Sequence, residues 1–258
     1  MSTLPYRAWF VACAMTLLIA AQVIFASALS AQAETNPVVV DGVTYDAYIP
    51  AAVKHGPFKH YTCEFDAAWI VLKTYGHDVG LEEQLGLLGV DDRIEPYYEE
   101  KDDGVFIYGG DVTKWYSGDY TENFLARTTG EAMRKVFEHF DLDVDVVRNR
   151  EQVEAALLNG QLIWIKTTVD FKKWVPATWV MPNGDTYQTV LGNDHAVVVM
   201  GFNDDGVVIR DPLGPTSSNW NRQYEYVVDW KTFLWAWGAQ GNDGLAVGPK
   251  QLVATPAV

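Results

Sequence analysis

The stretch TCEFDAAWIVLKTYG, residues 62–76, has the pattern of a buried helix that begins at a cysteine. Thr62 can serve as the N-cap, and two acidic side chains follow in the first turn, where the helix dipole favours them. The middle of the stretch is apolar on nearly all sides, and Gly76 supplies a left-handed stop. The pattern predicts a central helix with Cys63 at its N-terminus, where unpaired backbone N–H groups favour a thiolate over a thiol.

The first 33 residues have the composition of a targeting segment. Arg7 is the only charged side chain in residues 1–33, an apolar run covers 8–28, and the segment ends in Ser-Ala-Gln-Ala before Glu34. Small residues at these positions are typical of a signal-peptidase site, so we expect a mature chain that begins near Glu34. The run is also just long enough to span a bilayer, so an uncleaved membrane anchor is the alternative. Either reading predicts an exported bacterial protein, extracellular or associated with the cell envelope.

The cysteine count limits the possible chemistry. Cys13 and Cys63 are too few for a disulfide scaffold, a four-cysteine zinc site or an iron–sulfur cluster. Cleavage near Glu34 would remove Cys13 and leave a single thiol in an oxidising compartment. Such a thiol is either a small buried core side chain or a reactive group. Its place at a helix start favours a reactive role for Cys63.

Length and charge set further limits. The 258 residues are 48% apolar and 21% charged, enough for one large core, and we expect residues 34–258 to form a single domain. Nineteen Lys and Arg against 34 Asp and Glu give a formal charge of −15, so most of the surface would repel nucleic-acid phosphates. We therefore expect no nucleic-acid partner. Separately, we expect a monomer without a cofactor or a metal, in contact with a membrane only through residues 1–33.

A base for the thiol is offered by the run HAVVVMGF, residues 195–202. Asn-Asp-Asp-Gly and then VVIRDPLG follow it, and two β-branched runs around such a turn predict an antiparallel hairpin. Gly206 is expected in a left-handed conformation, and Pro212 ends the second strand at Asp211. The other four histidines lie in polar loops or on a helix. His195 is therefore the candidate base, and Asp211 is a candidate partner on the next strand.

The register of this hairpin decides how His195 and Asp211 meet. A turn centred near Asn203 would put them directly opposite each other. A turn centred on Asp205 would leave them on one face of the sheet but about four residues, roughly 13 Å, out of step. The turn chemistry leaves both registers open.

A cysteine at a helix start, a histidine on a strand and an aspartate on the next strand, in this order, are typical of a papain-like enzyme. With these residues in place, the sequence resembles the C39-like peptidases, relatives of the bacteriocin-leader peptidase domain. The resemblance covers roughly residues 40 to 245. Three blocks carry it: residues 61–76, 157–164 and 194–214. A fourth, looser match is the aromatic ending with Phe233, Trp237 and Gly238.

The resemblance implies an α+β, papain-like fold, in which an N-terminal helical part with the central cysteine helix packs on a C-terminal antiparallel β-sheet. It implies that Cys63 is the nucleophile, His195 the general base and acid, and Asp211 the residue that orients the imidazole. Family members carry a glutamine about six residues before the cysteine, and its amide helps to hold the oxyanion. This chain has Pro57 at that position.

The second oxyanion donor would then come from Lys59, His60 or Tyr61, beside the backbone N–H of Cys63. Losing one donor costs about 100- to 1,000-fold in rate, so a catalytically weak relative that only binds peptide is one alternative. Trp174 and Trp179, in a proline-punctuated loop before the histidine strand, are candidates to line the substrate cleft.

Residues 91–120 are acidic and rich in Tyr and Gly, without a sustained helical or strand period. They predict a long loop or insertion, either a solvated excursion or a wall of the cleft that prefers a basic or polar peptide. Calcium-loop spacing is absent from this stretch. Elsewhere the patterns predict helices over 129–140 and 151–158, the second closed by Asn159-Gly160, and a buried strand over 161–168.

Together these observations predict a secreted cysteine peptidase that hydrolyses peptide bonds through a thioester on Cys63. One alternative is a cell-wall amidase or peptidoglycan endopeptidase, since exported Cys-His enzymes often act there. The other is the pseudopeptidase that binds a peptide or a wall component without turnover.

Overall fold

Helix α2 (Cys63–Thr74) and the sheet beneath it organise the computed structural model, which describes residues 37–215 and 219–250. The predicted targeting segment, residues 1–33, lies outside the described residues. The α2 helix ends near Gly76, which has the expected left-handed backbone (φ 96°). Thr62 does not cap α2 as predicted: its hydroxyl donates to the Asp66 carboxylate 2.8 Å away instead. The helix and its stop therefore follow the sequence pattern, while its first turn is held by a different bond.

The main sheet has seven strands and is antiparallel throughout. Strand β10 lies near its centre between β7 and β11, and short β3 also pairs with β10. The spatial order of the other six is β12-β11-β10-β7-β13-β6. The strands are β3 (Ala47–Tyr48), β6 (Leu142–Val146), β7 (Leu162–Thr168), β10 (Asp194–Phe202), β11 (Gly206–Arg210), β12 (Glu225–Asp229) and β13 (Gly244–Pro249).

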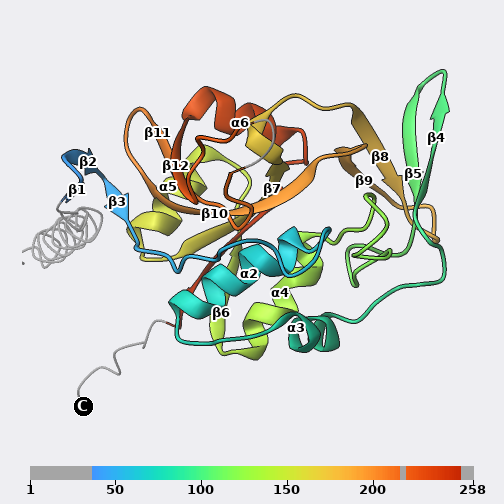
Figure 1. The fold of residues 1–258 in the computed structure, drawn as a ribbon, viewed down its shortest axis with the longest axis horizontal. Coiled ribbons are helices and arrows are strands. Elements are labelled where there is room, and N and C mark those ends of the chain that lie inside the picture. The colour runs from blue at the N-terminus through green and yellow to red at the C-terminus, as the bar shows by residue number, and fades with distance from the viewer. Residues whose placement is uncertain (1–36, 216–218, 251–258) are drawn as a thin grey trace, which may run out of the picture. The chain divides into compact units, whose positions relative to one another are not determined.

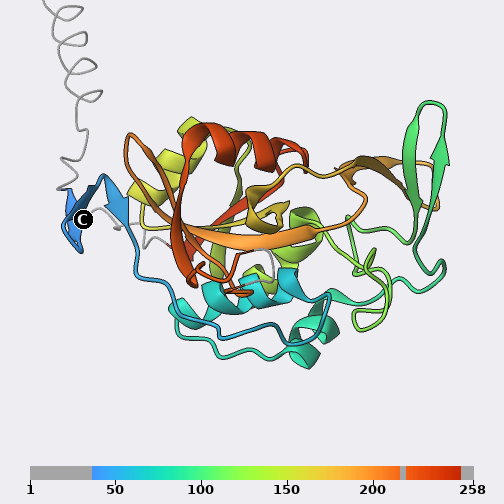
Figure 2. The same ribbon diagram turned by 45° about the horizontal axis from the view of Figure 1, so that its top comes forward.

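Helices cover both faces of this sheet (Figures 1 and 2). Alternate residues of β10 separate the two cores: Val198 packs with α2, α3 and α4, whereas Val197 packs with α5 and α6. This period of two is what a strand buried on both faces requires. The fold is therefore α+β, with the cysteine helix packed on an antiparallel sheet, as predicted. The other helices are α3 (Leu81–Leu88), α4 (Gly130–His139), α5 (Arg150–Leu158), α6 (Trp230–Gly238) and the 3₁₀ turn η1 (Val169–Phe171).

The elements predicted around α4, α5 and β7 are confirmed within a residue or two. Asn149 caps α5 by accepting a hydrogen bond from the backbone N–H of Gln152 at 2.9 Å, and Gly160 follows the helix with a φ of 78°. All seven residues of β7 are buried. The local signals in these stretches agree with the burial that the fold demands.

The acidic stretch 91–120 is not the irregular loop that the sequence predicts. It contains a hairpin of β4 (Tyr97–Lys101) and β5 (Gly104–Tyr108), joined at Asp102-Asp103. The hairpin extends a second, four-stranded sheet in the order β4-β5-β8-β9, with β8 (Pro176–Val180) and β9 (Thr186–Val190). All five residues of β4 are exposed, so this strand lacks the alternation that would have indicated it. A third sheet pairs β1 (Val38–Val40) with β2 (Val43–Tyr45).

The hairpin of β10 and β11 has neither of the two predicted registers. Near the turn, Gly201 pairs with Val208; beyond a β-bulge, Val199 pairs with Ile209. Met200 is the extra residue, and its carbonyl accepts a hydrogen bond from the backbone N–H of Ile49 at 2.7 Å. Because Val198 pairs with Arg210, the next residue of the second strand, Asp211, lies level with Val197, two residues from His195.

The turn itself also differs from the prediction. Gly206 does not have a positive φ; instead, a side chain at this position would place its Cβ 2.2 Å from the carbonyl oxygen of Val228 on the neighbouring strand. The Asn203 side chain closes the turn by accepting from the backbone N–H groups of Asp205 and Gly206 at 3.0 and 3.2 Å. Glycine is thus required here for close strand approach.

Candidate active site

The first residues of β10 bring His195 to Asp211. The imidazole is buried, and its Nε2 lies 2.9 Å from Oδ1 of Asp211. A carboxylate accepts only, so Nε2 carries the donated hydrogen and the neutral ring leaves its Nδ1 lone pair available. Because of the bulge at Met200, the side chains of His195 and Asp211 point to the same face of the sheet. Nδ1 is therefore the nitrogen that a thiol would meet.

Further groups hold Asp211 in place. Its Oδ1 also accepts from the backbone N–H of Leu213 at 2.8 Å, and its Oδ2 accepts from the Tyr226 hydroxyl at 2.7 Å. The guanidinium of Arg222 is 3.4 Å from Oδ2. Burial alone would raise the pKa of Asp211, but His195, Arg222 and Tyr226 hold it below its usual value. Asp211 is therefore a fixed, buried anion beside the histidine.

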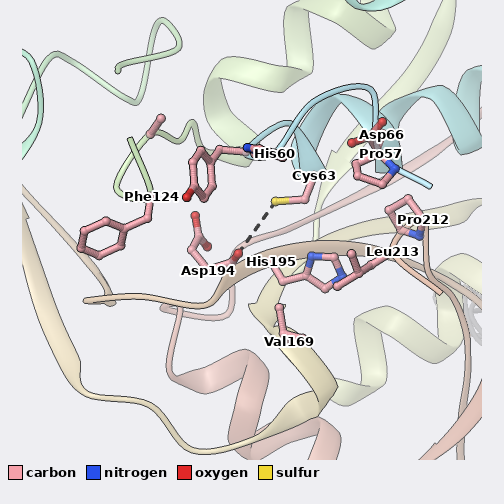
Figure 3. A pocket seen from close by; sticks show the side chains of 12 residues that line it. Pro57, His60, Cys63, Asp66, Phe124, Val169, Asp194, His195, Pro212 and Leu213 are labelled. Atoms are coloured by element: carbon pink, nitrogen blue, oxygen red, sulfur yellow. Dashed lines mark hydrogen bonds between the residues drawn. The ribbon is translucent and has the colours of Figure 1, made fainter. Parts of the chain in front are cut away.

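Cys63 is the first residue of α2, and its thiol is partly buried. Its Sγ is 3.3 Å from Oε2 of Glu64, to which it donates, and 3.9 Å from the carbonyl oxygen of Asp194. Figure 3 shows the sulfur turned toward the Asp194 carbonyl, with the His195 ring on its other side. Across the described residues, no hydrogen bond joins the Cys63 thiol to the ring.

The sequence predicts that the helix N-terminus favours the thiolate form of Cys63, and the surroundings of the thiol contradict this prediction. Burial and the neighbouring Glu64 carboxylate raise the pKa of the Cys63 thiol well above its usual value, although Lys166 acts in the opposite direction. Desolvation and a like charge outweigh the helix dipole, whose influence is limited to about 1 kcal/mol in most sites. The thiol form, hydrogen-bonded to Glu64, is favoured here.

A buried lysine links the neighbours of the two reactive side chains. Lys166 of β7 is fully buried, and its Nζ forms ion pairs with Oε1 of Glu64 and, at 2.6 Å, with Oδ2 of Asp194. Burial alone would lower the pKa of Lys166, but the two carboxylates raise it. Glu64 follows Cys63 and Asp194 precedes His195 in the chain. Lys166 therefore fixes helix α2 to the start of β10 at the site.

Asp194 has additional partners behind the site. The Gln240 amide donates to its Oδ1 at 2.6 Å, and the buried guanidinium of Arg127 lies 3.7 Å from its Oδ2. Gln240 also accepts from the hydroxyl of Thr189 in β9, to which Arg127 donates at 2.5 Å. These bonds join the segment after α6 and the second sheet to the same cluster. We call Glu64, Lys166, Asp194 and Arg127 the buried charge cluster; it holds two carboxylates and two cations.

Another buried carboxylate, that of Asp66, holds the segment before α2. Its Oδ1 accepts from the backbone N–H of Phe58 at 2.8 Å and pairs with Lys54 at 3.2 Å, while Oδ2 accepts from Thr62. Burial raises the pKa of Asp66 to about 6, although Lys54 and the hydrogen bonds act in the opposite direction. Asp66 thereby fixes the wall of the pocket that contains Pro57.

Cys63 and His195 open into one pocket of about 140 Å³. Most of the surface that lines it is apolar, and its polar side chains are spread around the pocket (Figure 3). The lining residues are Pro57, His60, Tyr61, Cys63, Asp66, Phe124, Ala126, Val169, Asp194, His195, Pro212 and Leu213. A concave, mostly apolar site with a few converging polar groups is typical of substrate binding.

The three candidate oxyanion residues occupy different places. His60 and Tyr61 line the pocket; Lys59 is exposed and does not. The backbone N–H of Tyr61 already donates to the carbonyl of Tyr120 at 2.9 Å, and Nδ1 of His60 lies 3.1 Å from the carbonyl of Thr121. The backbone N–H of Cys63, at the first position of α2, has no acceptor within the helix. It remains the donor that geometry favours.

The structure corrects the predicted role of Trp179. Its indole is fully buried with Ile107 and Val112 under the second sheet, and its Nε1 donates to the carbonyl of Gly110 at 2.9 Å. Trp179 therefore supports β5 and β8 and offers no surface to a substrate. Trp174 is 39% exposed but does not line the pocket.

Several residues of the site escaped sequence reasoning. Lys166 lies inside the apolar run that predicts a buried strand, and that single polar position is the one signal that could have marked it. Arg222 and Tyr226 come from a loop and an edge strand without a motif. Their partners are distant in sequence, so only the fold brings them to Asp211.

The described residues contain neither a cluster suited to a metal ion nor a helix suited to cross a membrane. No group of three or more His, Cys, Asp or Glu side chains within 37–215 and 219–250 is arranged to hold a metal ion. None of the described helices is both long and apolar enough to cross a membrane.

Comparisons with known proteins agree with this fold. A crystal structure of a candidate C39-like peptidase from Bacillus anthracis superposes with a TM-score of 0.61 at 17% identity, covering 84% of this chain and all of that one. No curated protein sequence matches the chain. The model of the Peptidase_C39 like family matches residues 46–245. The match covers most of the chain, including Cys63, His195 and Asp211, and the chain thus belongs to the Peptidase_C39 like family.

Proposed function

We propose that this protein is an exported cysteine peptidase that hydrolyses peptide bonds, with Cys63 as nucleophile, His195 as general base and acid, and Asp211 as the residue that orients the imidazole. One observation carries the proposal: the His195–Asp211 pair, 2.9 Å apart, opens into the same pocket as the thiol at the start of α2. Family membership supports the reaction class.

In the first half of the reaction, the Cys63 side chain rotates from Glu64 and the Asp194 carbonyl toward Nδ1 of His195. The ring takes the thiol proton, and Asp211 stabilises the imidazolium that results. The thiolate attacks the substrate carbonyl carbon, forming a C–S bond, and the carbonyl oxygen becomes an oxyanion near the backbone N–H of Cys63. His195 then returns the proton to the leaving amine as the C–N bond breaks, which leaves a thioester.

The second half reverses these roles. Water replaces the amine in the pocket, and Nδ1 of His195 removes one of its protons while the oxygen attacks the thioester carbonyl. The C–S bond breaks, the carboxylic acid product leaves, and the proton on His195 returns to the Cys63 sulfur. Asp211 stays ionised throughout, because its pKa is held below the usual value.

The proposal is tested with the purified protein on fluorescently labelled casein. We expect Cys63→Ala and His195→Ala to lower kcat/KM by about 10³-fold or more, because each removes a group that changes bonds. His139→Ala, at an exposed position on α4, is the matched control and should leave the rate unchanged. Circular dichroism shows whether each variant is folded. Undiminished activity of a folded Cys63→Ala protein would overturn the assignment.

A pseudopeptidase is the second candidate, and two observations favour it. The thiol donates to Glu64 rather than to His195, and Pro57, which has no N–H or side-chain amide, lines the pocket. A protein of this kind would bind a peptide at the apolar lining without cleaving it.

Binding and turnover separate the two candidates. Isothermal titration of a peptide pool against the parent and Cys63→Ala proteins measures binding, and mass spectrometry of the same mixtures measures cleavage. Peptide binding by both proteins, with no cleavage by the parent between pH 5 and 9, would select the pseudopeptidase. Cleavage by the parent alone selects the peptidase.

A further inference from the structure

The β4–β5 hairpin presents a strand with a free edge. Among the described strands, β4 pairs with β5 alone, and it is the end strand of the four-stranded sheet. All five of its residues, Tyr97–Lys101, are exposed, and the hairpin projects away from the main sheet in both views (Figures 1 and 2). A free edge presents backbone N–H and C=O groups in the spacing that another extended chain needs for pairing.

The hairpin is strongly acidic. Residues 95–108 contain five acidic side chains and a single cation, Lys101. That cation is already engaged: its Nζ lies 3.0 Å from Glu99 and donates to the Tyr108 hydroxyl at 2.6 Å. Consecutive strand residues point to opposite faces, so Glu99 and Glu100 place a carboxylate on each side of the edge. A chain added here would therefore meet negative charge with both sets of its side chains.

Aromatic contacts connect this edge to the pocket. The rings of Tyr98 in β4 and Phe124 meet edge to face with centroids 6.5 Å apart, and Phe124 lines the pocket of Cys63. The Asn123 amide donates to the Pro96 carbonyl at 2.9 Å and to the Glu95 carboxylate at 2.6 Å, which fixes the base of β4 beside Phe124. Tyr98 and Phe124 are 43% and 45% exposed, so a peptide could contact both.

We propose that the free edge of β4 binds an extended lysine- or arginine-rich segment of the polypeptide substrate and leads it past Tyr98 and Phe124 to Cys63; this inference rests on the peptidase function proposed above. Main-chain pairing supplies a register, and the carboxylates select the basic side chains. A second copy of β4 fits the edge poorly, because its glutamates would face those of the first copy.

The binding test uses the Cys63→Ala protein, so no cleavage is needed. The probe is a fluorescein-labelled decapeptide in which pairs of lysines alternate with pairs of valines, so that both faces of the extended peptide carry lysine. Its affinity is measured by fluorescence anisotropy. Glu99→Gln/Glu100→Gln should weaken binding by about two- to fivefold per carboxylate, the range for exposed charge pairs. The control, Glu82→Gln/Glu83→Gln, removes the same charge from exposed positions on α3 and should leave the affinity unchanged. Equal losses in the two double variants would overturn the proposal.

Two further probes test the mode of binding. The same peptide with glutamate in place of every lysine should not bind. N-methylation of alternate amides removes the hydrogen bonds of one edge of the peptide, so methylating one set should abolish binding and methylating the other should not. If both methylated peptides bind like the parent peptide, strand addition is wrong. A dimer in sedimentation that the basic peptide cannot dissociate would assign the edge to a second copy instead.

The outcome is independent of the peptidase assignment. If the lysine–valine peptide binds at the hairpin but the parent never cleaves it or casein, the proposed function fails and the β4 site stands. If the parent cleaves the peptide and the hairpin variant has the same KM as the α3 control, the β4 site fails and the peptidase stands.

Discussion

The two halves of the active site differ in how completely they are assembled. On the side of the base, each oxygen of Asp211 has at least two partners, and His195 is already bonded to it at 2.9 Å. On the side of the nucleophile, the Cys63 thiol donates to Glu64 instead of the histidine, and the buried thiol has a raised pKa. The base is preorganised, whereas the thiol of the nucleophile is hydrogen-bonded to a carboxylate and not to the base.

The difference teaches where activation must occur. Nothing around His195 needs to move, whereas the Cys63 side chain has to leave Glu64 before it can transfer its proton. Lys166 connects the halves, because it binds the residue after the nucleophile and the residue before the base. Disturbing one half, the other or the link should therefore have distinct effects.

The base half should give the largest effect. Asp211→Ala leaves His195 without its orienting acceptor, so we expect kcat/KM on casein to fall by about 10²- to 10⁴-fold. Asp211→Asn keeps an oxygen acceptor for Nε2 of His195 and should recover part of the rate. A folded Asp211→Ala protein with parental kinetics would show that the histidine is not held through Asp211.

The next largest effect is expected at Lys166, which connects the two halves. Lys166→Met leaves Glu64 and Asp194 buried with Arg127 as the remaining cation, so the free energy of unfolding in urea should fall by about 3–5 kcal/mol. The control is Lys73→Met, which breaks an exposed ion pair between the end of α2 and Asp78 and should have little effect. If the parent and Lys166→Met unfold in urea with the same midpoint and the same slope, the buried charge cluster does not stabilise the fold.

Asp66 predicts a pH dependence of stability. Its pKa is about 6 in the folded protein and near 3.8 when unfolded, so its contribution is complete below pH 4 and is lost as the pH rises through 6. Relative to Asp66→Asn, the parent should lose about 2–3 kcal/mol of unfolding free energy between pH 4 and pH 7. Other carboxylates also make the unfolding free energy depend on pH, and comparison with the variant cancels their contribution. A constant difference across this range contradicts the raised pKa.

The nucleophile half should give the smallest effect, and it should be a gain. Glu64→Gln removes the anion beside Cys63 while Lys166 stays, so the pKa of the thiol should fall and iodoacetamide should label it about tenfold faster at pH 7.5. Glu83→Gln on α3 is the matched control. Slower or unchanged labelling would mean that the Glu64 carboxylate does not hold the thiol proton.

Local signals explain which parts of the fold the sequence predicts. Helix α2, helix α5 and strand β7 follow from apolar period, caps and stops that lie within each segment. The even separation of His195 and Asp211 predicts a shared face only for an even register. The pairing near the turn is odd, and the bulge at Met200 makes it even beyond Val199. Because the carbonyl of Met200 is bonded to Ile49, which is far away in sequence, the hairpin sequence alone predicts neither the bulge nor the level of the two residues.

Features built by distant partners were beyond sequence reasoning. The charge cluster joins Glu64 to Lys166 across 102 positions, and no pattern within either segment indicates the pair. The β4–β5 hairpin was missed for a different reason: β4 is exposed on both faces, so it has no apolar alternation. Trp179 lies in a loop-like sequence, but the second sheet encloses it completely.

The bulge at Met200 determines which insertions and deletions the β10–β11 hairpin can accept. Deleting one residue there would restore an unbroken ladder and turn every side chain from Asp194 to Val199 to the opposite face, so that His195 would point into the core beneath α2. Adding two residues to the turn at 203–206 would leave these faces unchanged. Among relatives, the length of this hairpin should therefore vary in steps of two, and an odd change should be accompanied by loss or relocation of the bulge.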